Sequence, residues 1–135
     1  MKTHLLLLIA LLAQSVIGAE YTLEKFWASM PTNEKQIGNM HGDIAVSSKN
    51  EVYISVQGGP KAGVQVYDNK GNYLRNVPNA PTDFHGFVIR ETESGEHIYG
   101  PRLGGQNILK LTLDGKTVLD IKPATVPTKF KRGGR

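Results

Sequence analysis

An internal repeat of 44 residues is the feature that most constrains how this chain can fold. A His-Gly dipeptide at residues 41–42 recurs at 85–86, and Gly71 recurs as Gly115. Both pairs are 44 positions apart. A period of this length indicates an array of similar supersecondary units, each of which buries its apolar faces against neighbours.

Each unit of the repeat predicts four short strands. Runs rich in Val, Ile and Tyr alternate with Asn, Asp, Gly and Ser, and helical periodicity is absent after residue 20. The predicted strands cover 42–47, 51–56, 63–67 and 72–77 in the first unit and 86–91, 96–100, 107–112 and 116–121 in the second. Four antiparallel strands in a repeat of this size are typical of a β-propeller blade. An all-β sandwich is the alternative.

The two units can be aligned along most of their length. The apolar and turn patterns pair residues 43–46 with 87–90, 51–54 with 96–99, and 64–74 with 108–118. This alignment assumes one extra residue before the second strand of the second unit. It predicts which positions of the two sheets are equivalent.

The first unit also resembles a known repeat. Its segment Gly63–Leu74 reads Gly-Val-Gln-Val-Tyr-Asp-Asn-Lys-Gly-Asn-Tyr-Leu and is similar to the most recognisable stretch of the NHL repeat. The resemblance covers residues 38–121 and is weaker in the second unit. It departs from the family after the second strand, where NHL blades often carry Asp and this chain has Ser55 and Gly100. The resemblance implies a six-bladed ring like those of secreted bacterial propellers, which in turn resemble the lyase domain of peptidylglycine amidating enzymes.

Residues 1–19 have the order of a secretory signal peptide. One basic residue precedes the apolar run Leu5–Ala13, and small residues follow up to Ala19. The run is too short to cross about 30 Å of hydrocarbon, and a buried N-terminal helix is the alternative. We therefore expect a secreted or periplasmic protein with no membrane attachment after cleavage. The absence of cysteine excludes disulfides, Cys-ligated zinc and a lipoprotein anchor.

The rest of the chain divides into four parts. Residues 20–37 are predicted as an N-terminal strand or linker of the kind that closes a propeller ring, 38–80 and 81–122 as blades, and 123–135 as a basic connection that is cut short. Two blades alone leave their outer faces open. We therefore expect an inactive fragment of a longer product that lacks about four blades. The alternative is a ring assembled from three copies with two blades each.

The formal net charge of +4 does not indicate a nucleic-acid partner. Residues 20–128 hold eleven Lys or Arg against twelve Asp or Glu, whereas the last seven residues carry four cations. A basic RNA-binding segment is the alternative interpretation of these last residues, but an exported protein has little use for one, and a connection between blades that is cut short explains them better. We expect no nucleic-acid partner.

His41 and His85 are the candidate metal ligands. Both stand just before the first strand of their unit, and this strand lines the central channel of a propeller, so we expect both at one channel mouth. Neutral imidazole is a common ligand of transition metals, and a catalytic zinc site uses three protein ligands and one water. No cofactor is assigned from the sequence, and zinc or calcium is the ion considered for this place. A purely structural role in contacts between blades is the alternative. By resemblance, the amidating lyases hold zinc on histidines from different blades, but those blades are well separated.

Other polar residues are expected at the same rim. Asp43 and Asp83 flank this rim, and either is predicted to orient a histidine or to help bind a cation. Paired with Arg102, they are also predicted to bind a polar ligand, with Asp43 and Arg102 as the assigned residues. His97 is predicted to lie at the surface or between blades. The chain has no catalytic-triad signature, phosphate-binding loop or His-Glu-x-x-His motif, and no catalytic residue is assigned. The sequence therefore predicts an exported scaffold that binds a ligand or protein at the channel mouth. The alternative is a metal-dependent lyase or hydrolase similar to the amidating lyases.

Overall fold

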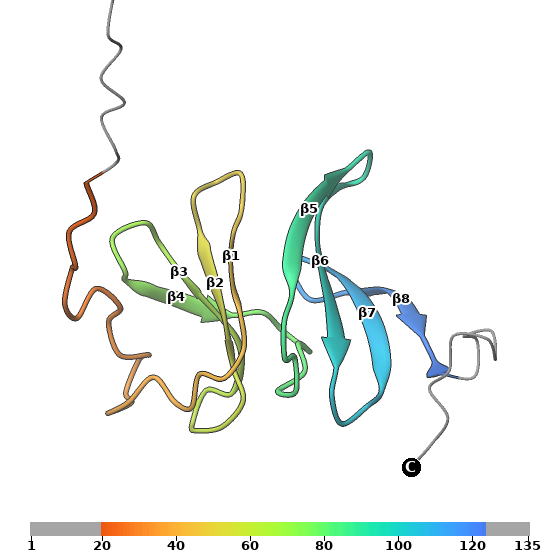
Figure 1. Ribbon diagram of the computed structural model, residues 1–135, viewed down its shortest axis with the longest axis horizontal. Coiled ribbons are helices and arrows are strands. Elements are labelled where there is room, and N and C mark those ends of the chain that lie inside the picture. The colour runs from red at the N-terminus through yellow and green to blue at the C-terminus, as the bar shows by residue number, and fades with distance from the viewer. Residues whose placement is uncertain (1–19, 124–135) are drawn as a thin grey trace, which may run out of the picture.

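The computed structural model describes residues 20–123, which form two four-stranded antiparallel sheets and no α-helix (Figure 1). Within each sheet, every strand pairs with the next one along the chain. The strands are β1 (Ile44–Val46), β2 (Val52–Val56), β3 (Gly63–Tyr67) and β4 (Tyr73–Asn76) in the first sheet, and β5 (Val88–Thr92), β6 (Gly95–Arg102), β7 (Asn107–Thr112) and β8 (Thr117–Ile121) in the second. All eight predicted strands are confirmed, with ends that differ by no more than two residues.

The two sheets pack face to face around one core. Its buried side chains come from both sheets and from the connection between them: Tyr53, Val64, Val66, Val77, Phe84, Phe87, Ile89, Ile98, Leu109 and Leu111. In Figure 1 the first sheet lies on the left and the second on the right, with this core between them. The prediction of two antiparallel four-stranded sheets is therefore confirmed.

The repeat is visible in the last hairpin of each sheet. In the β3–β4 turn the Asp68 amide donates to the Asn72 carbonyl at 3.0 Å, and in the β7–β8 turn the Thr112 amide donates to the Lys116 carbonyl at 2.9 Å. A β-bulge precedes both turns. These equivalent positions are 44 residues apart, as the sequence predicts.

The first hairpins are aligned differently from the prediction. Tyr53 on β2 is equivalent to Tyr99 on β6, so the second strands of the two sheets are 46 residues apart. Their partners on the first strands, Ala45 and Val88, are 43 residues apart. The predicted offsets were 45 and 44, and both were wrong by one residue. The physical reason is the β5–β6 hairpin, which continues its ladder to Thr92 and contains three more residues than the β1–β2 hairpin.

A one-residue error matters because it exchanges the two faces of a strand. We call the side that bears Tyr53 in the first sheet and Tyr99 in the second the forward face. The opposite side, which bears Val52 and Ile98, is the rear face. Tyr53 and Ile98 lie in the shared core. The forward face of the first sheet therefore packs on the rear face of the second, and the sheets meet through non-equivalent faces.

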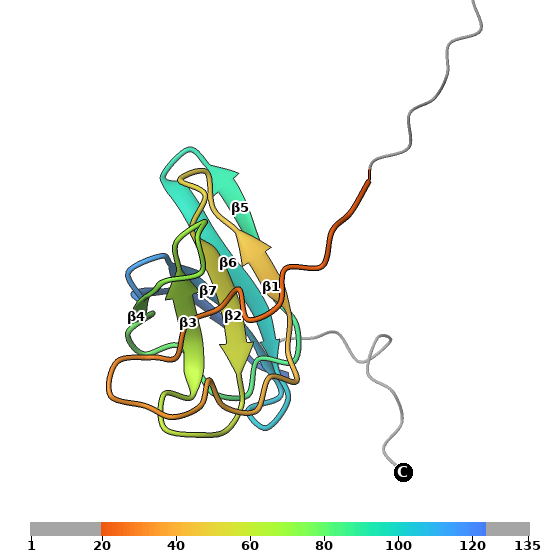
Figure 2. The same cartoon turned by 90° about the vertical axis from the view of Figure 1, so that its left-hand side faces the viewer.

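The N-terminal segment covers part of the rear face of the first sheet (Figure 2). Trp27, Ala28 and Ile37 pack against Ile54, Val56 and Tyr67. Residues 20–37 were predicted as a strand or a linker, and the structure shows no strand within them. Left-handed backbone at Phe26 and Asn33, with φ of 60° and 66°, interrupts the extended conformation that a strand needs.

The predicted signal peptide (1–19) and all but the first residue of the predicted basic connection (123–135) lie outside the described residues. Within residues 20–123 we find no helix with the length and apolar character needed to span a membrane.

Candidate functional site

The structure brings His41 and His85 together. Their ring centroids lie 5.2 Å apart, and the ring planes meet at 86°, an edge-to-face arrangement. Both side chains are exposed. Each histidine follows a segment that bonds to the end of the second strand of its sheet: Asn39 pairs with Gly58, and Phe84 pairs with Arg102. The repeat position and the packing of the sheets together make the two rings neighbours.

A buried hydrogen bond holds the two segments in place beside the histidines. The Ser55 hydroxyl donates to the Phe84 carbonyl at 2.7 Å, which links the first sheet to the segment that carries His85. Gly42 lies against the same serine, since a Cβ at this position would be 2.4 Å from the Ser55 Cβ. The glycine after His41 therefore permits a close approach of chain segments, which a side chain would prevent.

The described residues supply only two metal ligands at this place. No group of three or more His, Cys, Asp or Glu side chains in residues 20–123 is arranged to hold a metal ion. Asp43 lies near Gly86, and its Oδ1 accepts a hydrogen bond from the Ile44 amide at 2.9 Å. Two imidazoles fit the anchor of a zinc ion but not a complete catalytic site, which needs three protein ligands.

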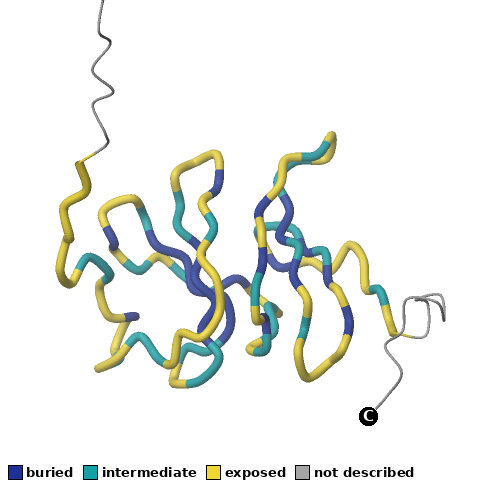
Figure 3. The backbone as a smooth tube through the Cα atoms, in the orientation of Figure 1, coloured by how far each residue is buried: buried dark blue, intermediate teal, exposed yellow. Residues whose placement is uncertain are grey.

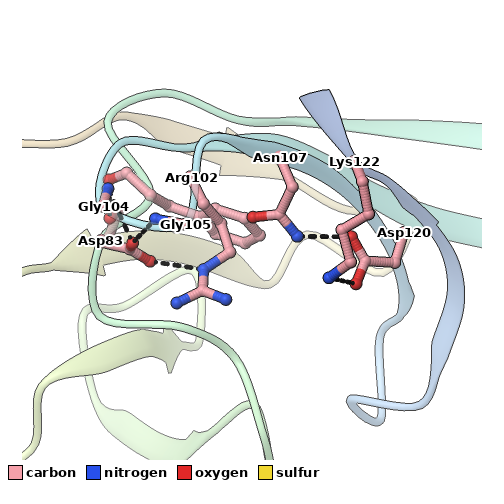
Figure 4. Close-up of polar contacts among 9 residues, drawn as sticks. Asp83, Arg102, Gly104, Gly105, Asn107, Asp120 and Lys122 are labelled. Carbon is pink, nitrogen blue, oxygen red and sulfur yellow. Dashed lines mark hydrogen bonds and ion pairs between the residues drawn. The ribbon is translucent and has the colours of Figure 1, made fainter. Parts of the chain in front are cut away.

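Arg102 is held by Asp83 and not by Asp43 (Figure 4). Arg102 Nε donates to Asp83 Oδ1 at 2.8 Å, and the amides of Gly104 and Gly105 donate to Asp83 Oδ2 at 3.0 and 3.1 Å. The hydrogen bond from Arg102 is the largest influence that lowers the pKa of Asp83. Asp83 thus orients the guanidinium of Arg102, with which the sequence analysis had grouped it, and not a histidine. The amides of the Gly104-Gly105 turn need a hydrogen-bond acceptor, and this was the sequence signal that could have indicated the role of Asp83.

The same end of the second sheet carries further polar side chains that the sequence did not single out. Asn107 Nδ2 donates to Asp120 Oδ1 at 2.5 Å, and Lys122 forms an ion pair with Asp120 (Figure 4). These two contacts lower the pKa of Asp120, the one from Lys122 more strongly. The Oδ1 atom of Asn107 is buried and has no hydrogen-bond partner among the described residues. The terminal nitrogens of Arg102 carry no bond to the other residues drawn in Figure 4.

His97 is separate from the histidine pair. It is buried within the β5–β6 hairpin, and its Nδ1 lies 2.8 Å from the Gly95 carbonyl and 3.1 Å from the Thr92 hydroxyl. The local turn therefore accounts for its hydrogen bonds.

No protein-family model matches this sequence, and no curated protein or solved structure matches it. The resemblance of residues 38–121 to NHL repeats stays a prediction based on motif and period.

Proposed function

We propose that this chain forms two adjacent blades of an exported NHL-type β-propeller scaffold. On this proposal, the scaffold binds a ligand or protein at the end of the sheets where His41 and His85 meet. The observation that carries the proposal is the packing of the forward face of one sheet on the rear face of the next. Blades in a ring must stack in this head-to-tail manner, because each blade repeats its predecessor by rotation. A two-layer sandwich needs no such relationship between its sheets.

Three side chains at this end of the sheets can contact a ligand: the imidazoles of His41 and His85 and the guanidinium of Arg102. The two imidazoles are exposed and adjacent, so they can donate or accept hydrogen bonds toward a common ligand. Arg102 approaches the same end through its pairing with Phe84, next to His85, and Asp83 fixes its orientation. A polar or anionic group on the partner would match this set of donors.

A metal-dependent enzyme is the second candidate, favoured by the 5.2 Å separation of the histidine rings. His41 and His85 would hold a zinc ion, which would supply Lewis-acid chemistry when bound. The third protein ligand would have to come from another sheet, because the described residues lack it. The role of this chain would then be to hold the ion, and no catalytic step is assigned to its own residues.

The sheet packing can be tested by solution NMR. Forward-on-rear packing predicts nuclear Overhauser contacts between the Tyr53 ring and the methyl groups of Ile98 and Leu111. Contacts between the rings of Tyr53 and Tyr99 would instead indicate that equivalent faces meet, and the blade proposal would fail.

Titration with Zn²⁺ tests the histidine pair. We expect binding that weakens at least about tenfold in His41→Ala and in His85→Ala, because each variant removes one of two ligands. His97→Asn is the matched control, since it removes a histidine that lies away from the pair; circular dichroism checks its fold. Unchanged affinity in both alanine variants would exclude metal binding at the pair and with it the enzyme candidate.

A further inference from the structure

We propose that copies of this chain associate head to tail, with the forward face of the second sheet in one copy packed on the rear face of the first sheet in the next. This inference rests on the forward-on-rear packing that underlies the proposed function. It names the partner: a second copy of the same chain. An interface of this kind joins two different surfaces, so it can extend from copy to copy.

The forward face of the second sheet is exposed where its counterpart is buried. Val64 in the first sheet is fully buried, whereas the equivalent Ile108 is 47% exposed. Val88 and Leu119 lie on the same face of the second sheet and are also exposed. These apolar side chains from three of the four strands form a surface that soluble proteins usually cover. Figure 3 shows β8 exposed along most of its length.

The rear face of the first sheet shows the complementary exposure. Phe87 is 3% exposed, but the equivalent Ile44 is 60% exposed. Ile89 is buried in the shared core, but the equivalent Val46 on β1 is exposed. On β1, the positions that the second sheet uses to contact the first are therefore uncovered. On β3, Gln65 and Tyr67, the equivalents of Leu109 and Leu111, are buried.

The N-terminal segment leaves this part of the rear face free. If Gly71 carried a Cβ, this atom would lie 1.8 Å from the Trp27 carbonyl oxygen. A Cβ at the equivalent Gly115 would lie 1.8 Å from the Pro78 carbonyl oxygen. Trp27 therefore packs over the last turn of the first sheet in the same way that Pro78, in the connection between the sheets, packs over the last turn of the second. The connection and the first sheet both contact the rear face of the second sheet. In the same way, the N-terminal segment and a sheet from another copy can both contact the rear face of the first sheet.

The surfaces identify the partner because the chain already packs them against each other. Within the chain, Ala45 on the forward face packs against the cluster that contains Phe87 and Ile89 on the rear face. Between copies, Val88 takes the place of Ala45, and Ile44 and Val46 take the places of Phe87 and Ile89. The contact from Ser48 to Glu96 is not repeated, because the hairpin tips differ by three residues. We therefore expect weaker association between copies than packing within one.

Single cysteines test the geometry, because the chain has none of its own. Val88→Cys and Val46→Cys proteins, one of them carrying a mass tag, are mixed and mildly oxidised. We expect the mixed disulfide to exceed both symmetric ones, because only the mixed pair places one cysteine on each of the two surfaces that meet, at the counterparts of Ala45 and Ile89. Leu103→Cys is the matched control: Leu103 is exposed in the β6–β7 turn, away from both surfaces, and its disulfide with Val46→Cys should stay at the random level.

Light scattering with the full chain gives an independent measurement. We expect a mass that rises with concentration, and at least about tenfold weaker association in Val88→Glu and in Val46→Glu, because each buries a charge in an apolar contact. Leu103→Glu should leave association unchanged, and NMR spectra confirm the fold of all three variants. A monomer mass at every concentration together with no excess of mixed disulfide would overturn the inference. In that case intact contacts from Tyr53 to Ile98 would leave the proposed function standing, and their loss would remove both.

Discussion

Ser48 in the tip of the first hairpin donates two hydrogen bonds to Glu96 on β6 of the second sheet. Its amide reaches Oε1 and its hydroxyl reaches Oε2, both at 2.7 Å. The bond from Ser55 to Phe84 links the sheets near the histidines, so polar contacts hold the two layers at both ends of their shared core. The placement of His41 beside His85 depends on this arrangement.

We expect Glu96→Ala to lower the free energy of unfolding by about 1 kcal/mol, because it removes two hydrogen bonds at an exposed position. Urea denaturation measures the change. Glu93→Ala is the control: Glu93 is an exposed glutamate in the same hairpin, with no hydrogen bond or ion pair to other described residues. Equal stability of the two variants would show that the contact from Ser48 contributes nothing.

The turn glycines beneath crossing chain segments should tolerate no side chain. Gly71→Ala and Gly115→Ala would place a Cβ 1.8 Å from a backbone carbonyl oxygen, at φ of +82° and +88°. We expect each to cost about 3 kcal/mol or more, since backbone has to move. Gly95→Ala is the matched control: its φ is +99° but no atom lies within 4 Å, so only the conformational cost of about 1–2 kcal/mol applies. Thermal unfolding ranks the three, and a Gly95 variant as unstable as the others would contradict the close contacts.

Two leucines of the same hairpin test which face is packed. Leu111 is fully buried, whereas Leu119 is about half exposed. We expect Leu111→Ala to destabilise the protein by about 2–5 kcal/mol and Leu119→Ala by less than about 1 kcal/mol in chemical denaturation. The reverse order would mean that the second sheet presents its other face to the first.

The carboxylate of Asp83 should make stability depend on acid pH. Its pKa is lowered in the folded protein, mainly by the hydrogen bond from Arg102. The stabilisation is therefore complete above the unfolded pKa of about 3.9 and is lost as the pH falls through the lower folded value. We expect Asp83→Asn to be less stable than the parent by about 1–3 kcal/mol at pH 7. The difference should shrink steadily below pH about 4.

Urea denaturation across this pH range measures the effect. Arg102→Gln is the comparison, since it removes the main cause of the lowered pKa and should reduce the same acid-dependent difference. A gap between parent and Asp83→Asn that stays constant down to pH about 2 would contradict the lowered pKa.

The positions of the eight strands and the bulged last hairpins follow from local sequence. Alternating β-branched residues and turn glycines act within a few residues, so the pattern predicts where each strand begins and ends. The common repeat position of His41 and His85 also predicted that they would share one end of the fold. Local patterns left residues 20–37 open as a strand or a linker, because the packing of their apolar residues on a face of the first sheet depends on tertiary contacts.

Tertiary structure alone decided which faces meet and which polar groups pair. The ladder of the β5–β6 hairpin extends by three residues, and this length shifts the equivalence of the strands by one position and exchanges their faces. Arg102 pairs with Asp83 because the glycine turn after β6 returns beside it, 19 residues away in sequence. Local sequence sets each strand by short-range preferences. Register, facing and side-chain partners depend on contacts between distant residues, so they were decided only when the two sheets packed.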